Sequence, residues 1–132
     1  METDDEKLED LLREGEEAQK SEQWEKSLGY YSSAFDFLIG GAKDHAQKAE
    51  PAAMESILGN GAMSTQYLSK FNEYLKKDLT AATVSNNMAL LFSRMGNKSS
   101  AASFFEQAID LTPEGVTYDA PHVGLEMLKN LA

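Results

Sequence analysis

The spacing of apolar side chains predicts helices along most of the chain. In the last third, apolar residues recur every three or four positions on two segments that a Gly96-Asn97 turn separates. The first segment carries Val84, Met88, Leu91, Phe92 and Met95, and the second carries Ala101, Phe104, Phe105, Ala108, Ile109 and Leu111. Pro113 has no amide hydrogen and ends the second helix. We therefore expect a helical hairpin over residues 82–115.

The first third repeats this plan. Its two apolar stripes are Leu8, Leu11, Leu12 and Ala18 on one segment, and Trp24, Leu28, Tyr31, Phe35 and Leu38 on the next. Ser21 is a favourable N-cap for the second helix, and Gly40-Gly41 is a typical helix end. The sequence thus predicts a hairpin over residues 8–41.

A shift of 74 positions superposes the two hairpins, and half of it, 37, predicts a middle hairpin over residues 45–78. The Gly59-Asn60-Gly61 turn then separates its two helices, and Pro51 marks a start or a kink in the first. Two-helix repeats of about 33 to 47 residues are typical of solenoids, in which each hairpin buries its apolar face on a neighbour. We expect one all-α domain, residues 1–132, built as three stacked helix-turn-helix hairpins.

A last apolar stripe predicts one more helix over residues 121–131. Leu125, Leu128 and Leu131 share one face, opposite Glu126 and Lys129. Terminal units of solenoids cover the exposed end of the last repeat. We expect this helix to cap the third hairpin.

Composition and charge narrow the location and the partners. The chain has no cysteine, an acidic N-terminus and a formal net charge of −10, and no apolar stretch approaches the roughly 20 residues that span a bilayer. We expect a cytoplasmic protein. An acidic surface repels phosphate backbones and anionic membranes, so we expect neither as a partner and favour a neutral or basic protein. The alternative is that the acidity serves solubility alone.

The third hairpin resembles the tetratricopeptide repeat family. Small, aromatic, turn and proline residues stand where the family has such types: Ala89, Phe92, Gly96, Ala101, Phe105, Ala108 and Pro113. The first hairpin is similar through Gly15, Trp24, Tyr31 and Ala34, but has Glu22 in place of the turn glycine and Ile39 in place of the final proline. The 37-residue spacing exceeds the family's usual length of about 34 and indicates longer connections.

The resemblance implies a right-handed superhelical stack whose first helices line a concave groove. In the family, such a groove holds a peptide or a helix of a partner protein. On this chain the implied groove residues are Leu12, Arg13, Glu16, Lys20, Ala53, Asn86, Asn87, Leu90 and Arg94. We therefore expect a protein–protein interaction adaptor or scaffold.

One branch of the family clamps the acidic C-terminal tails of chaperones with Lys, Asn and Arg. Here only Asn87 stands at a clamp position, while Leu12, Glu16, Glu50 and Thr83 occupy the others. Glutamates in the groove of a −10 protein repel an acidic tail. A co-chaperone role is therefore an alternative that the sequence disfavours.

Chemical motifs are weak. His122 and Glu126 are spaced to share a helix face, but two ligands are not a metal site. Asp110–Gly115 has a glycine where a calcium loop needs one, and Pro121 where it needs a glutamate. No nucleophile, base and orienting group can be assembled, so we expect no enzyme, no cofactor and no metal.

A second alternative is a structural subunit that docks or self-associates through its outer helix faces. Tyr67 and Tyr74 lie on one predicted helix, and tyrosine is enriched at interaction hot spots. Such a subunit forms a constitutive oligomer, whereas a groove-binding adaptor does not.

Overall fold

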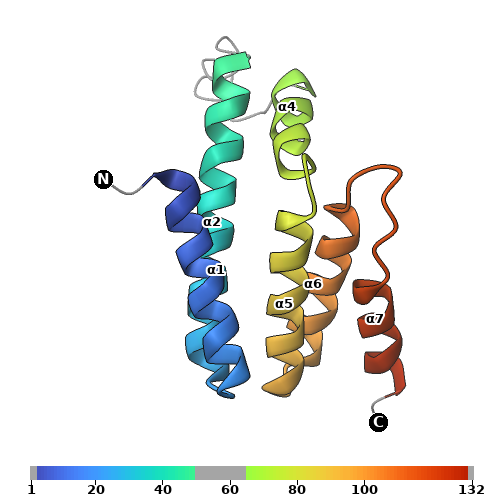
Figure 1. Cartoon of the computed structure of the whole chain (residues 1–132). Coiled ribbons are helices and arrows are strands. Elements are labelled where there is room, and N and C mark those ends of the chain that lie inside the picture. The colour runs from blue at the N-terminus through green and yellow to red at the C-terminus, as the bar shows by residue number, and fades with distance from the viewer. Residues whose placement is uncertain (1–2, 50–64, 131–132) are drawn as a thin grey trace.

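A computed structural model describes residues 3–49 and 65–130, which form helices and no strand. The six helices are α1 (Asp4–Lys20), α2 (Trp24–Ala49), α4 (Thr65–Leu75), α5 (Thr80–Arg94), α6 (Lys98–Asp110) and α7 (Ala120–Asn130). The all-α class is confirmed. In Figure 1, α4 lies beyond one end of α5, beside the last turns of α2, and the other helices lie side by side.

The α1–α2 hairpin begins with a capping box. The Thr3 hydroxyl accepts a hydrogen bond from the Glu6 amide, and the Glu6 carboxylate accepts one from the Thr3 amide. Two N–H groups at the start of the helix, which have no partner within it, are thereby satisfied. Across the hairpin, the buried Ser27 hydroxyl donates to the Gly15 carbonyl at 2.6 Å. The Tyr31 ring packs on Gly15, where an added Cβ would meet it at 3.0 Å. The glycine therefore lets the two helices approach closely.

The α5–α6 hairpin has the same turn, displaced by 74 positions. The Gln23 amide donates to the Ala18 carbonyl, and the equivalent Asn97 amide donates to the Phe92 carbonyl. Glu22 and Gly96 occupy equivalent positions and both have a positive φ, 60° and 79°. The 74-residue shift deduced from the sequence is thus a structural equivalence of the two turns, although glutamate is a costly residue for this conformation.

The two hairpins pack directly on each other, since α5 contacts both α2 and α6. The three-hairpin prediction places a middle hairpin over residues 45–78, of which the structure describes 45–49 and 65–78. Residues 45–49, predicted to open the middle hairpin, form the end of α2, and α4 packs against α2. The rest of the predicted first helix, with Pro51, Ala53 and the Gly59-Asn60-Gly61 turn, lies outside the described residues.

The predicted helix end at Gly40-Gly41 is wrong, because α2 continues to Ala49. Ala42 and Ala46 extend the buried stripe of Leu38 at i+4 spacing, and α4 covers it. Gly41 lies against the Tyr74 ring of α4, and no side chain would fit there without displacing that ring. The glycine marks a close approach of two helices instead of a helix end.

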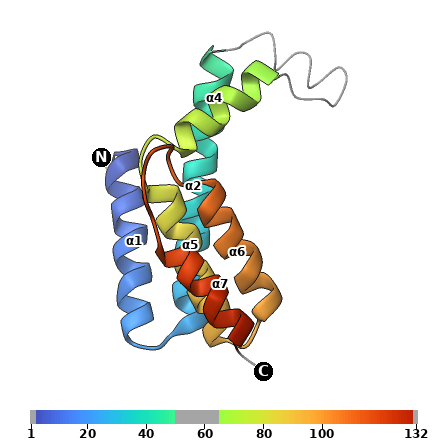
Figure 2. The same cartoon turned by 90° about the vertical axis from the view of Figure 1, so that its right-hand side faces the viewer.

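The core runs along the junction of α2 with α5 and continues between α5 and α6. Helix α7 packs on α6, with Gly124 against the fully buried Phe105 ring. The predicted capping helix is therefore present (Figure 2), and Leu131 lies outside the described residues.

Candidate functional site

A groove separates α1 from the start of α5. Its cavity has a volume of about 440 Å³, and the buried Tyr31 of α2 contributes to the lining. Its lining residues are Leu12, Glu16, Tyr31, Asp78, Leu79, Thr80, Thr83, Val84 and Asn87. The structure thus brings together three residues of the predicted groove: Leu12, Glu16 and Asn87.

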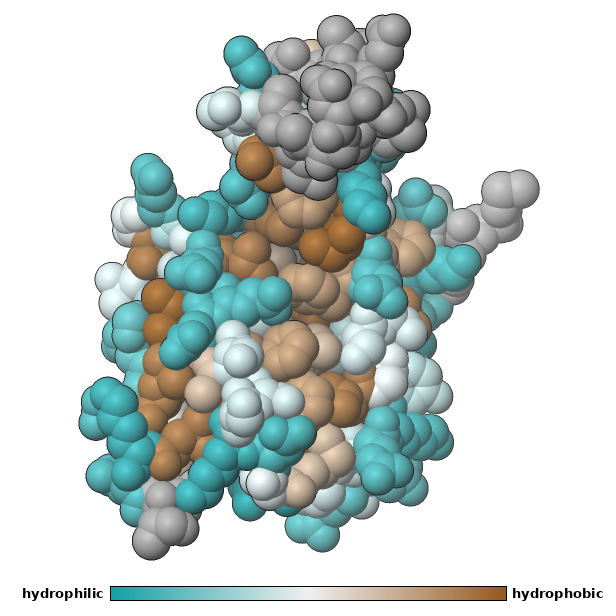
Figure 3. All heavy atoms as spheres, turned by 180° about the vertical axis from the view of Figure 1, so that it is seen from behind, coloured by the Kyte–Doolittle hydropathy of each residue, from teal (hydrophilic) through white to brown (hydrophobic). Residues whose placement is uncertain are grey.

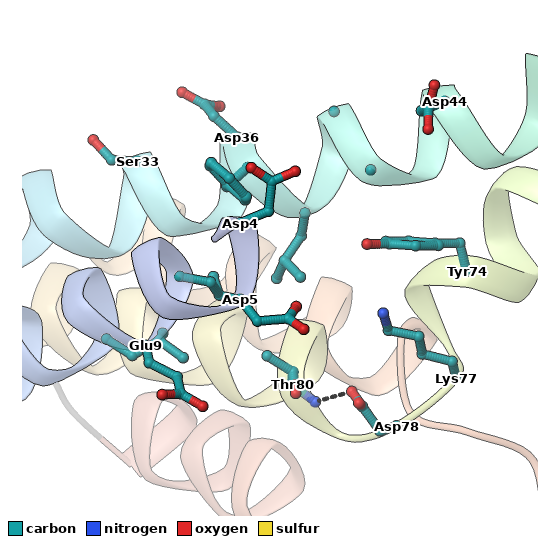
Figure 4. Close-up of a pocket in the computed structure, with 16 residues that line it drawn as sticks. Asp4, Asp5, Glu9, Ser33, Asp36, Asp44, Tyr74, Lys77, Asp78 and Thr80 are labelled. Carbon is teal, nitrogen blue, oxygen red and sulfur yellow. Dashed lines mark hydrogen bonds between the residues drawn. The ribbon is translucent and has the colours of Figure 1, made fainter. Parts of the chain in front are cut away.

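A larger cavity of about 850 Å³ adjoins this groove, and the two share Leu12, Asp78 and Thr80. Its walls are the first turns of α1, the middle of α2, and the end of α4 with the α4–α5 link, as Figure 4 shows. We call it the acidic notch; its lining is Asp4, Asp5, Leu8, Glu9, Leu12, Ser33, Asp36, Phe37, Leu38, Gly40, Gly41, Asp44, Tyr74, Lys77, Asp78 and Thr80. The notch exists because α2 extends past the N-terminus of α1.

The lining of the notch is strongly negative. Six carboxylates line it, on Asp4, Asp5, Glu9, Asp36, Asp44 and Asp78. The single cation of the lining is Lys77, whose ammonium lies 4.0 Å from the centre of the Tyr74 ring. The apolar side chains of Leu8, Phe37 and Leu38 lie among these charges, so the notch combines an apolar surface with a negative potential.

Tyr31 links the groove to the core. Only 2 % of the residue is exposed, and its hydroxyl donates to Gln19 Oε1 at 3.1 Å. Burial raises the pKa of the Tyr31 phenol above its ordinary value, and the negative charge of Glu16 raises it further, whereas a hydrogen bond with Asn87 opposes the rise. The phenol therefore loses its proton less readily than that of an exposed tyrosine.

Other predicted groove residues lie outside the two cavities. Arg13 is exposed and pairs with Asp10 at 2.8 Å, and Lys20 pairs with Glu16 at 3.1 Å. Both pairs connect neighbouring turns of α1 and are of the exposed kind that adds little stability. Arg13 and Lys20 contribute charge near the groove but do not form its wall.

The predicted groove residues of α5 lie on different faces of the helix. Leu90 is 38 % exposed, and Arg94 lies 5.9 Å from the Trp24 ring centre at the junction of the hairpins. Asn86 is only 5 % exposed and lines neither cavity. It lies one residue before Asn87, and adjacent helix positions point about 100° apart.

The sequence did not predict the notch as a site. Asp44 and Asp78 were not singled out, because α2 was expected to end at Gly40-Gly41 and Asp78 was expected to close a middle hairpin. The alanines at 42 and 46, which continue the buried stripe, were the signal that could have extended the helix.

Within residues 3–49 and 65–130, no three His, Asp or Glu side chains come together in a way that could hold a metal ion. The notch carboxylates are dispersed over three structural elements. None of the helices in this part of the chain is long and apolar enough to cross a membrane.

Apolar surface is also present away from the groove. Figure 3, seen from the side opposite to Figure 1, shows brown surface in a central area and along one edge of the molecule. On α7, Val123 and Met127 are 54 % and 63 % exposed, one helical turn apart. These residues give α7 an apolar strip on its outer side.

In comparisons with known proteins, no family model, no curated protein and no solved structure matches the chain. The tetratricopeptide assignment therefore stays a prediction from the sequence.

Proposed function

We propose that this protein is a binding module of the tetratricopeptide type, which holds a peptide or helix of a partner protein in the groove between α1 and α5. The observation that carries the proposal is the continuous concave surface of the groove and the notch, with Leu12, Tyr31 and Val84 among polar rim residues. Ligand sites combine an apolar lining with a few polar groups in this way. The first helices of the two hairpins, α1 and α5, line the groove, as the family resemblance implies.

The proposal favours a protein segment over a small substrate. The two cavities join along α1, which is about 25 Å long at 1.5 Å per residue. About eight extended residues cover that length. The cavities offer many carboxylates but no paired nucleophile and base among their described lining residues, so binding is the chemistry that they support.

A single arginine in the groove tests the proposal. Thr83 is an exposed lining residue of α5, and Thr83→Arg fills the groove without removing core packing. Ser103→Arg on the exposed side of α6 is the matched control. The partner is first captured from lysate by the wild type and identified, and the purified partner is then titrated against all three proteins.

We expect Thr83→Arg to weaken binding of the purified partner at least about tenfold, since each 1.4 kcal/mol lost is a factor of ten. Ser103→Arg should bind like the wild type. Equal binding by all three folded proteins places the partner elsewhere and rejects the groove.

A second candidate function is docking through the outer face of α7, which the exposed Val123 and Met127 favour. Light scattering with size exclusion over a hundredfold concentration range separates the two. A mass that doubles in the wild type but not in Val123→Glu/Met127→Glu supports self-association.

A further inference from the structure

We infer that the acidic notch selects the partner: the bound segment carries lysine or arginine side chains on the flank that leaves the groove beside the N-terminus of α1. This inference rests on the proposed function, because it assigns the chemistry of the segment that the groove holds. The notch is continuous with the groove, so a segment lying on Leu12 reaches both. Six carboxylates line the notch that this part of the segment enters.

Some of these carboxylates have roles within the fold. Asp4 and Asp5 lie in the first turn of α1, where the helix dipole favours acids. Asp44 pairs with Lys48 at 3.0 Å, and Asp78 accepts the Thr80 amide at 2.9 Å at the start of α5. The dipole explains acids on α1 but not the presence of acids on all three walls of one cavity.

Glu9 and Asp36 have no such role. Each forms no ion pair within the part of the chain that the structure describes, although both line the notch. Glu9 lies beyond the first turn of α1, and Asp36 is in the middle of α2. Both side chains are exposed, so their charges are available to a cationic ligand.

The dispersion of the carboxylates indicates the kind of cation. They come from α1, α2 and the α4–α5 link, and those within residues 3–49 and 65–130 form no cluster that could enclose a metal ion. A single small ion therefore contacts too few of them. Several positive charges spaced along a peptide chain match carboxylates that are dispersed over three walls. The long aliphatic parts of lysine and arginine side chains also cover apolar surface such as that of Leu8 and Phe37.

Lys77, the one cation of the notch lining, lies against an aromatic ring and so does not neutralise the carboxylates of α1. Lys77 lies over the Tyr74 ring, and such a cation–π contact holds the ammonium against the aromatic face. The carboxylates on α1 therefore keep their negative charge available for the ligand. Figure 4 shows Asp4, Asp5 and Glu9 on α1, and Lys77 and Asp78 on the opposite wall.

The test uses a library of random twelve-residue peptides displayed on phage, selected on the whole protein. Twelve extended residues span about 40 Å and cover both cavities. Selected peptides are synthesised, and their contacts are mapped by the chemical shifts of the Leu12 and Val84 methyl groups. Affinities are measured for the wild type, for Asp5→Asn/Glu9→Gln in the notch and for Glu106→Gln/Glu114→Gln, a control pair with the same charge change on exposed residues outside both cavities.

We expect groove-binding peptides to be enriched in Lys and Arg at least about twofold over the unselected library, mainly at one end. The Asp5→Asn/Glu9→Gln pair should weaken them about fivefold, as the loss of two exposed charge pairs implies. The control pair should leave affinity within about twofold, and the fivefold difference should shrink at high salt, where the screening length falls to about 3 Å.

The alternative outcomes are distinct. Groove-binding peptides without basic enrichment reject the notch inference and keep the groove function. Equal weakening by the two charge pairs shows that net charge alone attracts the peptides, and also rejects the inference. A selection in which no peptide shifts the Leu12 and Val84 methyl groups rejects both the groove function and the inference.

Discussion

The two hairpins share a turn and a 74-residue shift, yet their first helices differ sharply in burial. Helix α5 has eight buried residues among fifteen, whereas α1 has two among seventeen. The buried Val84, Met88 and Leu91 of α5 stand at the positions of Asp10, Glu14 and Glu17 in α1, which are not buried.

The difference follows from the neighbours of each helix. Helix α5 packs against both α2 and α6, while among the described helices α1 packs mainly on α2. A helix face that is not covered by another helix stays in water and is polar. The acids of α1 thus stand at the positions of the α5 core, and equivalent substitutions in the two helices should differ in their effect.

The largest contrast is expected at Leu91 and Glu17. Leu91 is fully buried, so Leu91→Ala should lower the free energy of unfolding by about 2 to 5 kcal/mol, through lost burial and a cavity. Glu17→Ala at the equivalent exposed position should change it by less than about 0.5 kcal/mol. Urea unfolding followed by circular dichroism measures both, and equal losses would contradict the comparison.

The turns give the next contrast. Gly96→Ala places a side chain at a φ of 79° and should cost about 1 to 2 kcal/mol. Glu22→Gly should relieve the same strain at a φ of 60°, and the greater entropy of glycine in the unfolded chain offsets part of the gain. We expect a net gain of about 0.5 to 1 kcal/mol. Thermal unfolding of both variants checks the opposite signs, and a loss in Glu22→Gly would show that the glutamate side chain has a stabilising contact.

A smaller effect on stability is expected at Gly15, whose equivalent in α5 is Ala89. Gly15→Ala improves helix propensity by up to about 1 kcal/mol, but the new Cβ lies 3.0 Å from the Tyr31 ring. The two effects oppose each other, so stability should change by less than about 0.5 kcal/mol. Gly29→Ala on α2, where nothing lies near the added atom, should show the full gain. Similar values for the two variants would mean that the ring moves aside.

The smallest effect concerns Tyr31, the equivalent of Phe105. Because the pKa of Tyr31 is raised in the folded protein, its phenol stabilises the fold below the ordinary tyrosine pKa of about 10. This contribution is lost as the pH rises through that value toward the folded-state pKa, since only the unfolded chain ionises readily. Tyr31→Phe should therefore lose less stability above about pH 10 than the wild type. Unfolding curves at neutral and alkaline pH measure the difference, and parallel losses would contradict it.

The prediction of Ser21 as the N-cap of the second helix is wrong, because Ser21 is the C-cap of α1 and α2 begins at Trp24. Periodicity predicted the helices of the two hairpins and α7, because their apolar stripes are continuous. It failed at Gly41, because a glycine that ends a helix and a glycine that admits a tyrosine ring look alike in a sequence. It could not locate the acidic notch, since that cavity needs Asp5, Asp36 and Asp78, which only the three-dimensional arrangement brings together. Of the groove residues that the resemblance implies, Leu12, Glu16 and Asn87 line one cavity.

The position of Trp24 gives the molecule a built-in optical probe. It is the only tryptophan of the chain, it opens α2, and its ring lies 5.9 Å from the Arg94 guanidinium at the end of α5. Its fluorescence therefore reports the seam where one hairpin meets the other, without any label. Excitation at the red edge of the indole band separates this signal from that of the five tyrosines. A ligand that changes the angle between the hairpins will shift the emission, whereas one that leaves the seam closed will not.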